Sequence, residues 1–201
     1  MCAKYLAILG GSIAVVAATI NMSAELRGSR RDAELLKQKV ASINAFGERP
    51  SKRSRRTAVS EKELNAYLIY EALQELPVGV VEPSVTILGT GRVAGRAVVD
   101  LDAVRKHKNP TSLLDPTFYL FGRLPLTATG ILRTSNGTGR FEFQSADAGG
   151  VPIPKIVLQE IVSYYSRTPE RPQGIGIDDP FPLPSRIREI QVERGQAIII
   201  Q

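Results

Sequence analysis

Alternating apolar and polar positions dominate the second half of the chain and predict β-strands. The alternation runs through Arg92–Asp102 and returns in Phe118–Arg133. Because successive side chains of a strand point to opposite faces, each segment is expected to have one apolar and one polar face. Asn136-Gly137 favours a type I′ turn, after which Arg140–Ser145 is expected to return as a strand with Phe141 and Phe143 inward.

Further strands are predicted on either side of these hairpins. Ser84–Leu88 precedes the first alternating segment, across a turn at Gly89-Thr90-Gly91. Near the end of the chain, Arg186–Val192 and Ala197–Gln201 are expected to pair about a turn at Arg194-Gly195.

Two segments have helical periodicity instead. In Thr57–Leu76, Ser60 and Glu63 have the spacing of a capping box, and Leu64, Leu68 and Ala72 recur on one side. In Pro154–Ser166 the apolar stripe contains Val157 and Ile161. A third helix is predicted over Asp32–Phe46. The fold class that follows is α+β, with a curved, mainly antiparallel sheet wrapped around one or two amphipathic helices.

The first residues form an uncharged apolar segment. Tyr5–Ile20 would extend about 24 Å as a helix, against about 30 Å of hydrocarbon in a bilayer. We therefore assign residues 1–24 to a signal peptide or membrane anchor, with a buried core helix as a third alternative. The arginines that follow favour a cytoplasmic body by the positive-inside rule.

The positive charge of the chain is concentrated between this segment and the predicted sheet. The net charge is +6, and Asn21–Thr57 holds 10 basic and 4 acidic residues, a net of +6. Residues 25–56 are assigned to a basic stalk or linker that precedes a domain over 57–201. Anionic lipid headgroups would be attracted to its basic run, Arg49, Lys52, Arg53, Arg55 and Arg56. A solvated tether is the alternative, and the absence of interleaved aromatic residues argues against nucleic acid.

Candidate catalytic chemistry is sparse. The chain has one cysteine, Cys2, and one histidine, His107, which sits among basic neighbours. Asp100 and Asp102 are expected to form cross-strand ion pairs with arginine, and Asp178-Asp179 to belong to a turn. We predict no catalytic residues, no metal site and no cofactor.

The order of motifs resembles small bacterial envelope proteins of the tubular lipid-binding (TULIP-like) group, in particular its YpmS-like and phospholipid-binding branches. The resemblance rests on a serine-capped E-L-N-x-x-L helix start (Ser60 to Leu68), a glycine-turned hairpin after it, and a late P-L-P…I-x-x-I-x-V-x-x-G hairpin. It covers about Thr57 to Gln201. It implies a sheet that leaves an apolar groove for acyl chains, and a location at the membrane, with the extracytoplasmic side favoured.

The function expected from this resemblance is non-enzymatic binding or transfer of a lipid. Small residues on the apolar faces of the strands, such as Gly95 and Ala128, would permit curvature and close approach of a ligand. An envelope module that binds a protein partner without lipid is one alternative. A cytoplasmic-facing module that uses the basic run on anionic lipid or nucleic acid is another. The residues predicted to line the lipid site are Leu64, Leu68, Val93, Ala97, Val99, Leu124, Leu126, Phe141, Phe143, Val157 and Ile161.

Overall fold

The protein is an α+β fold of two antiparallel sheets and several helices, as the sequence predicts. The computed structural model describes residues 28–48, 53–108, 121–165, 167–169 and 171–201. The predicted signal peptide or anchor, with Arg49 and Lys52 of the basic run, lies outside the described residues. In chain order the elements are α2 (Arg30–Glu48), β1 (Arg56–Ser60), α3 (Glu61–Tyr70), a 3-10 turn η1 (Leu73–Glu75), β2 (Val80–Gly89), β3 (Arg92–Asp100), α4 (Leu101–Lys108), β4 (Arg123–Ser135), β5 (Thr138–Ala148), β6 (Val151–Pro152), α5 (Lys155–Tyr165), β7 (Phe181–Pro182), β8 (Glu189–Glu193) and β9 (Gln196–Ile200).

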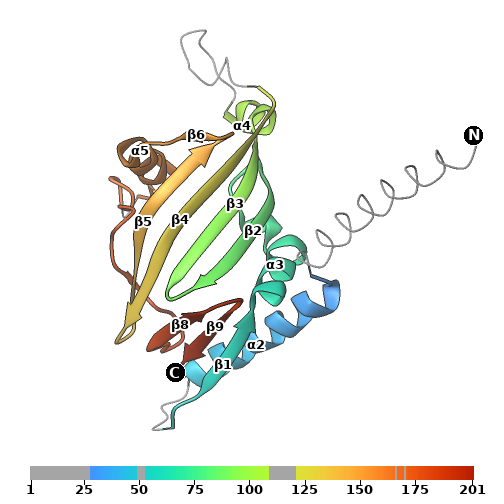
Figure 1. Cartoon of the computed structure of the whole chain (residues 1–201), viewed down its shortest axis with the longest axis vertical. Helices are drawn as coiled ribbons and strands as arrows, with labels where there is room; N and C mark the ends of the chain where they lie inside the picture. Colours follow the sequence, from blue (N-terminus) through green and yellow to red (C-terminus); the bar gives the residue numbers. More distant parts are fainter. Residues whose placement is uncertain (1–27, 49–52, 109–120, 166, 170) are drawn as a thin grey trace, which may run out of the picture.

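The larger sheet has six strands in the order β2-β3-β4-β5-β6, with β7 paired to the end of β5. The smaller sheet has the order β1-β9-β8 and lies at one end of the larger one (Figure 1). The hairpins β2–β3, β4–β5 and β8–β9 turn where the sequence indicates. Asn136 and Gly137 both have positive φ angles, 50° and 80°, as a type I′ turn requires.

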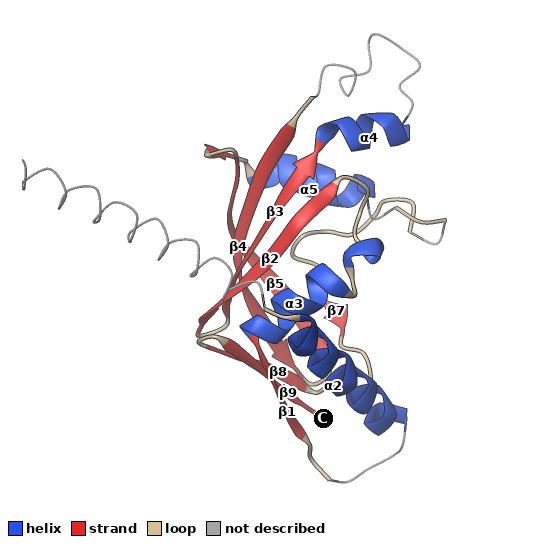
Figure 2. Cartoon of the chain, turned by 90° about the vertical axis from the view of Figure 1, so that its right-hand side faces the viewer, coloured by secondary structure: helices blue, strands red, loops and turns tan. Residues whose placement is uncertain are grey.

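The helices lie on one side of the larger sheet (Figure 2). α2 and α3 lie side by side next to the smaller sheet, whereas α4 and α5 lie near the opposite end of the larger sheet (Figures 1 and 2). A curved antiparallel sheet with packed helices is therefore confirmed.

The stretch Thr57–Leu76, in which one helix is predicted behind the Ser60 cap, is divided into a strand, a helix and a turn. β1 takes Arg56–Ser60 because β9 offers it a partner, with Ala58 opposite Ile198. Helix α3 begins at the predicted cap. The Glu63 N–H donates to Ser60 Oγ at 3.2 Å, and the Ser60 N–H donates to Glu63 Oε2 at 2.9 Å.

The buried side of α3 is not the stripe that periodicity predicts. Asn65 and Ala66 are buried, at 4% and 0% exposure, whereas Leu64 and Leu68 are half-buried. Asn65 turns inward because its side chain completes the free edge of β2. Its Nδ2 donates to the Val85 carbonyl at 2.9 Å, and its Oδ1 accepts from the Val85 N–H at 2.7 Å. Periodicity misses this role because it treats every amide as a surface residue.

Helix α2 belongs to the folded unit, although the sequence places its residues in the stalk. Its Leu36 and Ile43 are each 4% exposed, as the predicted helix over Asp32–Phe46 implies. Lys39 donates to both carboxylate oxygens of Glu63, at 2.7 and 2.8 Å, and to the carbonyl of Ala58. α2 is thus attached to both α3 and β1.

A short helix replaces the end of the second predicted strand. β3 stops at Asp100, whose Oδ1 accepts from the Ala103 N–H at 2.9 Å and so favours the first turn of α4. Asp102 pairs with Arg105 at 3.1 Å within this helix. The cross-strand pairs with arginine that the sequence suggests for Asp100 and Asp102 are therefore wrong: Asp100 caps α4, and Asp102 contacts Arg105 within α4 and accepts from the Gly122 N–H at 3.1 Å.

Candidate functional site

The strand register gathers apolar residues of four strands on one face of the larger sheet. Val93, Ala97 and Val99 of β3 lie opposite Gly130, Leu126 and Leu124 of β4. Leu126 lies opposite Ala148 of β5, and Leu132 lies opposite Phe141. We call this surface the apolar sheet face. Its members are Val80, Val85, Ile87, Val93, Gly95, Ala97, Val99, Leu124, Leu126, Ala128, Gly130, Leu132, Phe141, Phe143, Ala146 and Ala148.

The apolar sheet face carries most of the predicted site residues. At the edge of β5, the ring of Phe181 in β7 lies 2.6 Å from the position that a Cβ on Gly139 would occupy, and Gly139 shares the face of Phe141 two residues away. The register places seven predicted site residues on this one face of the larger sheet: Val93, Ala97, Val99, Leu124, Leu126, Phe141 and Phe143.

Most of this face is only half covered. Ile87 and Gly130 are buried, and the other members are of intermediate exposure. Ile87 lies at the end nearest α3, where its N–H donates to Glu61 Oε2 at 2.7 Å and its carbonyl accepts from the Gly195 N–H. The described helices therefore close one end of the face and leave its middle incompletely packed.

A row of small side chains crosses the middle of the face. Val85, Gly95, Ala128 and Ala146 are consecutive partners on β2, β3, β4 and β5. A Cβ built on Gly95 would have no atom within 4 Å beyond its chain neighbours, so the space above β3 is open at this point. Gly130 differs, because a Cβ there would lie 2.3 Å from the ring of Phe141.

The predicted helical residues contribute unequally. Leu64 and Leu68 in α3 are half-buried, and Val157 in α5 is 46% exposed. The buried stripe expected in α5 is therefore wrong at Val157, because α5 lies at the margin of the sheet and not under its centre. The side chain of Ile161 lies outside the described residues.

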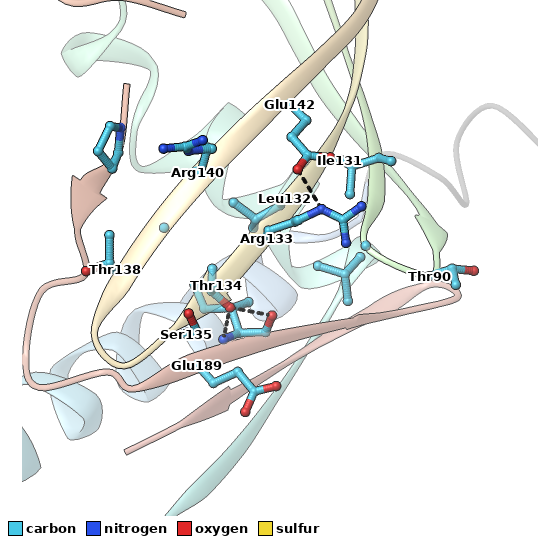
Figure 3. A pocket seen from close by; sticks show the side chains of 15 residues that line it. Thr90, Ile131, Leu132, Arg133, Thr134, Ser135, Thr138, Arg140, Glu142 and Glu189 are labelled. Carbon is cyan, nitrogen blue, oxygen red and sulfur yellow. Dashed lines mark hydrogen bonds and ion pairs between the residues drawn. The ribbon is translucent and has the colours of Figure 1, made fainter. Parts of the chain in front are cut away.

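A separate cleft, which the sequence did not predict, lies where the two sheets meet. It has a volume of about 650 Å³. Figure 3 shows side chains from the β4–β5 hairpin on one wall and from β8 on the other. Its lining residues are Thr90, Gly91, Ile131, Leu132, Arg133, Thr134, Ser135, Thr138, Gly139, Arg140, Glu142, Pro180, Glu189, Ile190 and Val192.

Some of the polar groups of this cleft bind other lining residues. Arg133 Nε donates to Glu142 Oε1 at 2.6 Å, as Figure 3 shows. Thr134 Oγ1 accepts from the Ile190 N–H at 2.7 Å and donates to its carbonyl at 3.0 Å, so it ties β4 to the edge of β8. The Thr134 contacts join the two sheets, whereas the Arg133–Glu142 pair links β4 to β5 within the larger sheet.

The described basic residues of the predicted headgroup site also serve the fold. The Arg55 guanidinium donates to the carbonyl and the hydroxyl of Ser42, at 3.1 and 2.7 Å, and lies 5.7 Å from the ring of Phe46. Arg56 donates to Gln191 Oε1 at 3.0 Å, and Arg53 is exposed.

A partly buried ion pair, Lys39–Glu63, joins α2 to α3. Burial opposes ionisation of Glu63, but the hydrogen bonds from Lys39 and Ser60, together with the Lys39 charge, outweigh it. The pKa of Glu63 therefore lies below its ordinary value of 4.5. Both carboxylate oxygens of Glu63 accept hydrogen bonds at the start of α3, so this side chain has a structural role.

The remaining chemical candidates have local structural partners. Asp179 accepts from the Gly176 N–H at 2.7 Å, as turn chemistry predicts. Cys2 and the side chain of His107 lie outside the described residues. In the part of the chain that the structure describes, no three His, Cys, Asp or Glu side chains gather as a metal site would need. Among these same residues, no helix has both the length and the apolar character needed to cross a bilayer.

Comparison with known proteins does not add to this picture. No protein-family model matches the sequence, and no curated protein matches it either. The resemblance to TULIP-like proteins therefore stays a prediction that rests on the motifs given above.

Proposed function

We propose that the protein is a non-enzymatic lipid-binding protein of the bacterial envelope, which holds an acyl chain against the apolar sheet face. The observation that carries the proposal is the open space above Gly95, at the centre of a face whose other side chains are apolar. Exposed apolar surface of this extent is costly in water, so a bound apolar chain would stabilise it.

The dimensions of the face fit a single acyl chain. Leu124 to Gly130 spans six residue steps of β4, or about 20 Å at about 3.3 Å per step. One leaflet of a bilayer contains about 15 Å of hydrocarbon, half of the total thickness.

The chemistry of the face favours a long apolar ligand over a small polar one. Each buried methylene contributes about 0.8 kcal/mol, so ten would contribute roughly 8 kcal/mol before the costs of association. In the middle row, Val85, Gly95, Ala128 and Ala146 provide no polar side chain that would fix a headgroup. The ligand's polar end is therefore expected to lie beyond the sheet.

The test is native mass spectrometry of the full chain with the substitution Gly95→Leu. Its matched control is Ala94→Leu, on the same strand but on the opposite face, where Ala94 lies between Thr86 and Thr129. Gly95 has no positive φ, so a side chain is sterically allowed there. We expect the unchanged chain and Ala94→Leu to retain co-purified lipid, and Gly95→Leu to lose most of it.

Comparing variants in the same full chain separates this site from the N-terminal apolar segment. Lipid carried by residues 1–24 would be equal in all three proteins, so only the part lost in Gly95→Leu reports on the sheet. Equal lipid in Gly95→Leu and Ala94→Leu would refute the proposal. It would favour the partner-binding alternative, for which cross-linking at this face is the next experiment.

A further inference from the structure

An ion pair lies near the outer edge of β5. Lys155, the first residue of α5, donates to Asp178 Oδ2, and the two side chains are half-exposed, at 51% and 49%. Asp178 belongs to the segment between α5 and β7, which runs alongside β5 in Figure 1. Because water reaches both side chains, another anion can reach this lysine as well.

The backbone of β5 explains why a carboxylate is held here. β7 pairs with β5 at Gly139, and β6 pairs with it at Asp147. Between these two residues, no strand in the described part of the chain covers the outer edge of β5. The Phe143 N–H lies in this uncovered stretch and hydrogen-bonds the Asp178 carboxylate. Asp178 therefore supplies an acceptor that a neighbouring strand would otherwise provide.

Several positive groups favour the ionised form of Asp178. Its pKa lies below the ordinary value of 3.8, mainly because Lys155 donates a hydrogen bond to it. The charge of Lys155, the Phe143 N–H and the charge of Arg140 act in the same direction, and burial opposes them. We call Lys155, the Phe143 N–H and Arg140 the edge anion site.

The edge anion site adjoins the apolar sheet face. Phe143 lies opposite Gly130 with its ring on that face, while its N–H serves the edge. Arg140 is the strand partner of Arg133, which pairs with Glu142. Figure 3 shows the Arg140 side chain directed away from that pair. One residue, Phe143, thus belongs both to the apolar surface and to the anion site.

The turn that carries Asp178 is attached to α5 by other contacts. The Ile177 N–H donates to Gln159 Oε1 at 2.8 Å, and the Gly176 N–H donates to Asp179 Oδ2 at 2.7 Å. These bonds hold the backbone of the turn whether or not the Asp178 carboxylate contacts Lys155. A rotation of the Asp178 side chain would therefore be enough to vacate the edge anion site.

The surrounding charges do not attract an anion by their sum. β5, α5 and residues 167–169 and 171–180 hold four basic and five acidic residues, a net of −1. The basic residues are Arg140, Lys155, Arg167 and Arg171, and the acidic residues are Glu142, Asp147, Glu160, Asp178 and Asp179. An added anion is therefore favoured only where it takes the place of the Asp178 carboxylate.

We propose that Asp178 occupies the site for the anionic head of the lipid, and that a lipid carboxylate or phosphate displaces it from the edge anion site. This inference rests on the proposed lipid-binding function, because an acyl chain on the apolar sheet face brings its head to this edge. It names the ligand class, a single-chain lipid with an anionic head. It also makes Asp178 an internal competitor that weakens the binding of such a lipid.

The test compares dodecanoate, dodecyl phosphate and the neutral dodecanol, which share one chain length. Their dissociation constants are measured by isothermal titration calorimetry on the delipidated full chain, below the concentrations at which these ligands form micelles. Asp178→Asn removes the competing charge, and Lys155→Gln removes the main donor. The matched control is Asp179→Asn, which removes the same charge from the neighbouring residue, whose carboxylate accepts from the Gly176 N–H.

The quantity that decides is the ratio of the dodecanol to the dodecanoate dissociation constant. Because exposed ion pairs contribute weakly, we expect it to rise about two- to fivefold in Asp178→Asn and to fall by a similar factor in Lys155→Gln. Asp179→Asn should change the ratio much less, and Lys155→Arg should preserve it. Dodecyl phosphate should respond in the same direction, and its affinity relative to dodecanoate distinguishes a phosphate head from a carboxylate head. Circular dichroism verifies that each variant is folded.

The outcomes separate this inference from the proposed function. An unchanged ratio in Asp178→Asn, or an equal rise in Asp179→Asn, would overturn the inference while the apolar site stands. If dodecanol fails to bind, or binds Gly95→Leu as tightly as the unchanged chain, the apolar site fails. Dodecanoate binding that still tightens in Asp178→Asn would then leave the edge anion site without an acyl site.

Discussion

The side chains at the two ends of this molecule are buried to different extents. Around α2, α3 and the small sheet, the interior includes Leu36, Ile43, Val59, Ile187 and Val192, each at most 9% exposed. Along the larger sheet the side chains of the apolar sheet face are mostly half-exposed, and Gly95 has open space above it. In both regions a regular period, helical or strand-like, gives each element an apolar side, so the difference comes from what covers that side.

This contrast suggests that the two regions have different roles within one chain. The packed end supplies most of the burial that holds the fold, while the open sheet keeps apolar surface available. A protein that needed only stability would cover this sheet as fully as it covers α2. The incomplete cover is therefore the feature that the proposed function explains.

The largest expected effect comes from a matched pair of leucine truncations. Leu36→Ala removes a side chain that is 4% exposed and should lower the free energy of unfolding by about 2–5 kcal/mol. Leu126→Ala removes a half-exposed one and should cost roughly 1 kcal/mol, because less apolar surface is returned to water. Urea denaturation of both full-length variants is the measurement. Equal losses would show that the sheet is as well packed as the helical end.

A second prediction concerns the contact between α2 and α3. Glu63→Ala removes both the capping-box acceptor and the partner of Lys39, and should cost about 1.5–3 kcal/mol. Glu63→Gln keeps a group that can accept from the Ser60 N–H and should cost less. A smaller loss in Glu63→Ala than in Glu63→Gln would contradict this assignment of roles.

The same residue predicts an acid dependence of stability. Because its pKa is lower in the folded state than its ordinary value of 4.5, Glu63 contributes stability that is fully present above that value. The contribution is lost as the pH falls through the folded-state pKa. Urea midpoints measured from pH 7 to pH 3 should therefore fall less steeply in Glu63→Gln than in the unchanged protein. Parallel pH profiles would assign the acid sensitivity to other carboxylates.

The smallest effect should come from Gly95, in comparison with Gly130 on the same apolar sheet face. Gly130→Ala would place a methyl group 2.3 Å from the Phe141 ring and should destabilise the protein by about 1–3 kcal/mol. Gly95→Ala meets no atom within 4 Å and should be neutral or stabilising by up to about 1 kcal/mol. The measurement is the midpoint of thermal unfolding of both variants. Destabilisation by Gly95→Ala would mean that the space above β3 is filled.

Much of the larger sheet could be predicted because it depends on local pattern. The alternation in β3 and β4 assigned Val93, Ala97, Val99, Leu124 and Leu126 to one face, and the register agrees. The Asn136-Gly137 turn and the Ser60 cap were equally local, since each depends on residues within four positions.

The candidate site was harder to predict where the position of a side chain depends on partners far away in the sequence. Helical periodicity places Asn65 on the polar side of its helix, but its side chain binds the backbone of Val85, 20 residues away. The cleft between β4–β5 and β8 depends on where two sheets meet, for which the sequence carries no periodic signal.

By itself, the sequence determined the α+β class, the hairpins and the apolar side of each long strand, because side-chain alternation and turn chemistry act over a few residues. Only the tertiary structure decided that Arg56–Ser60 pairs as a strand, that α2 is part of the core, and that Gly95 is left uncovered. Those outcomes depend on which distant surfaces compete for the same apolar area and the same backbone hydrogen bonds. The balance is set by the whole chain and not by any one segment.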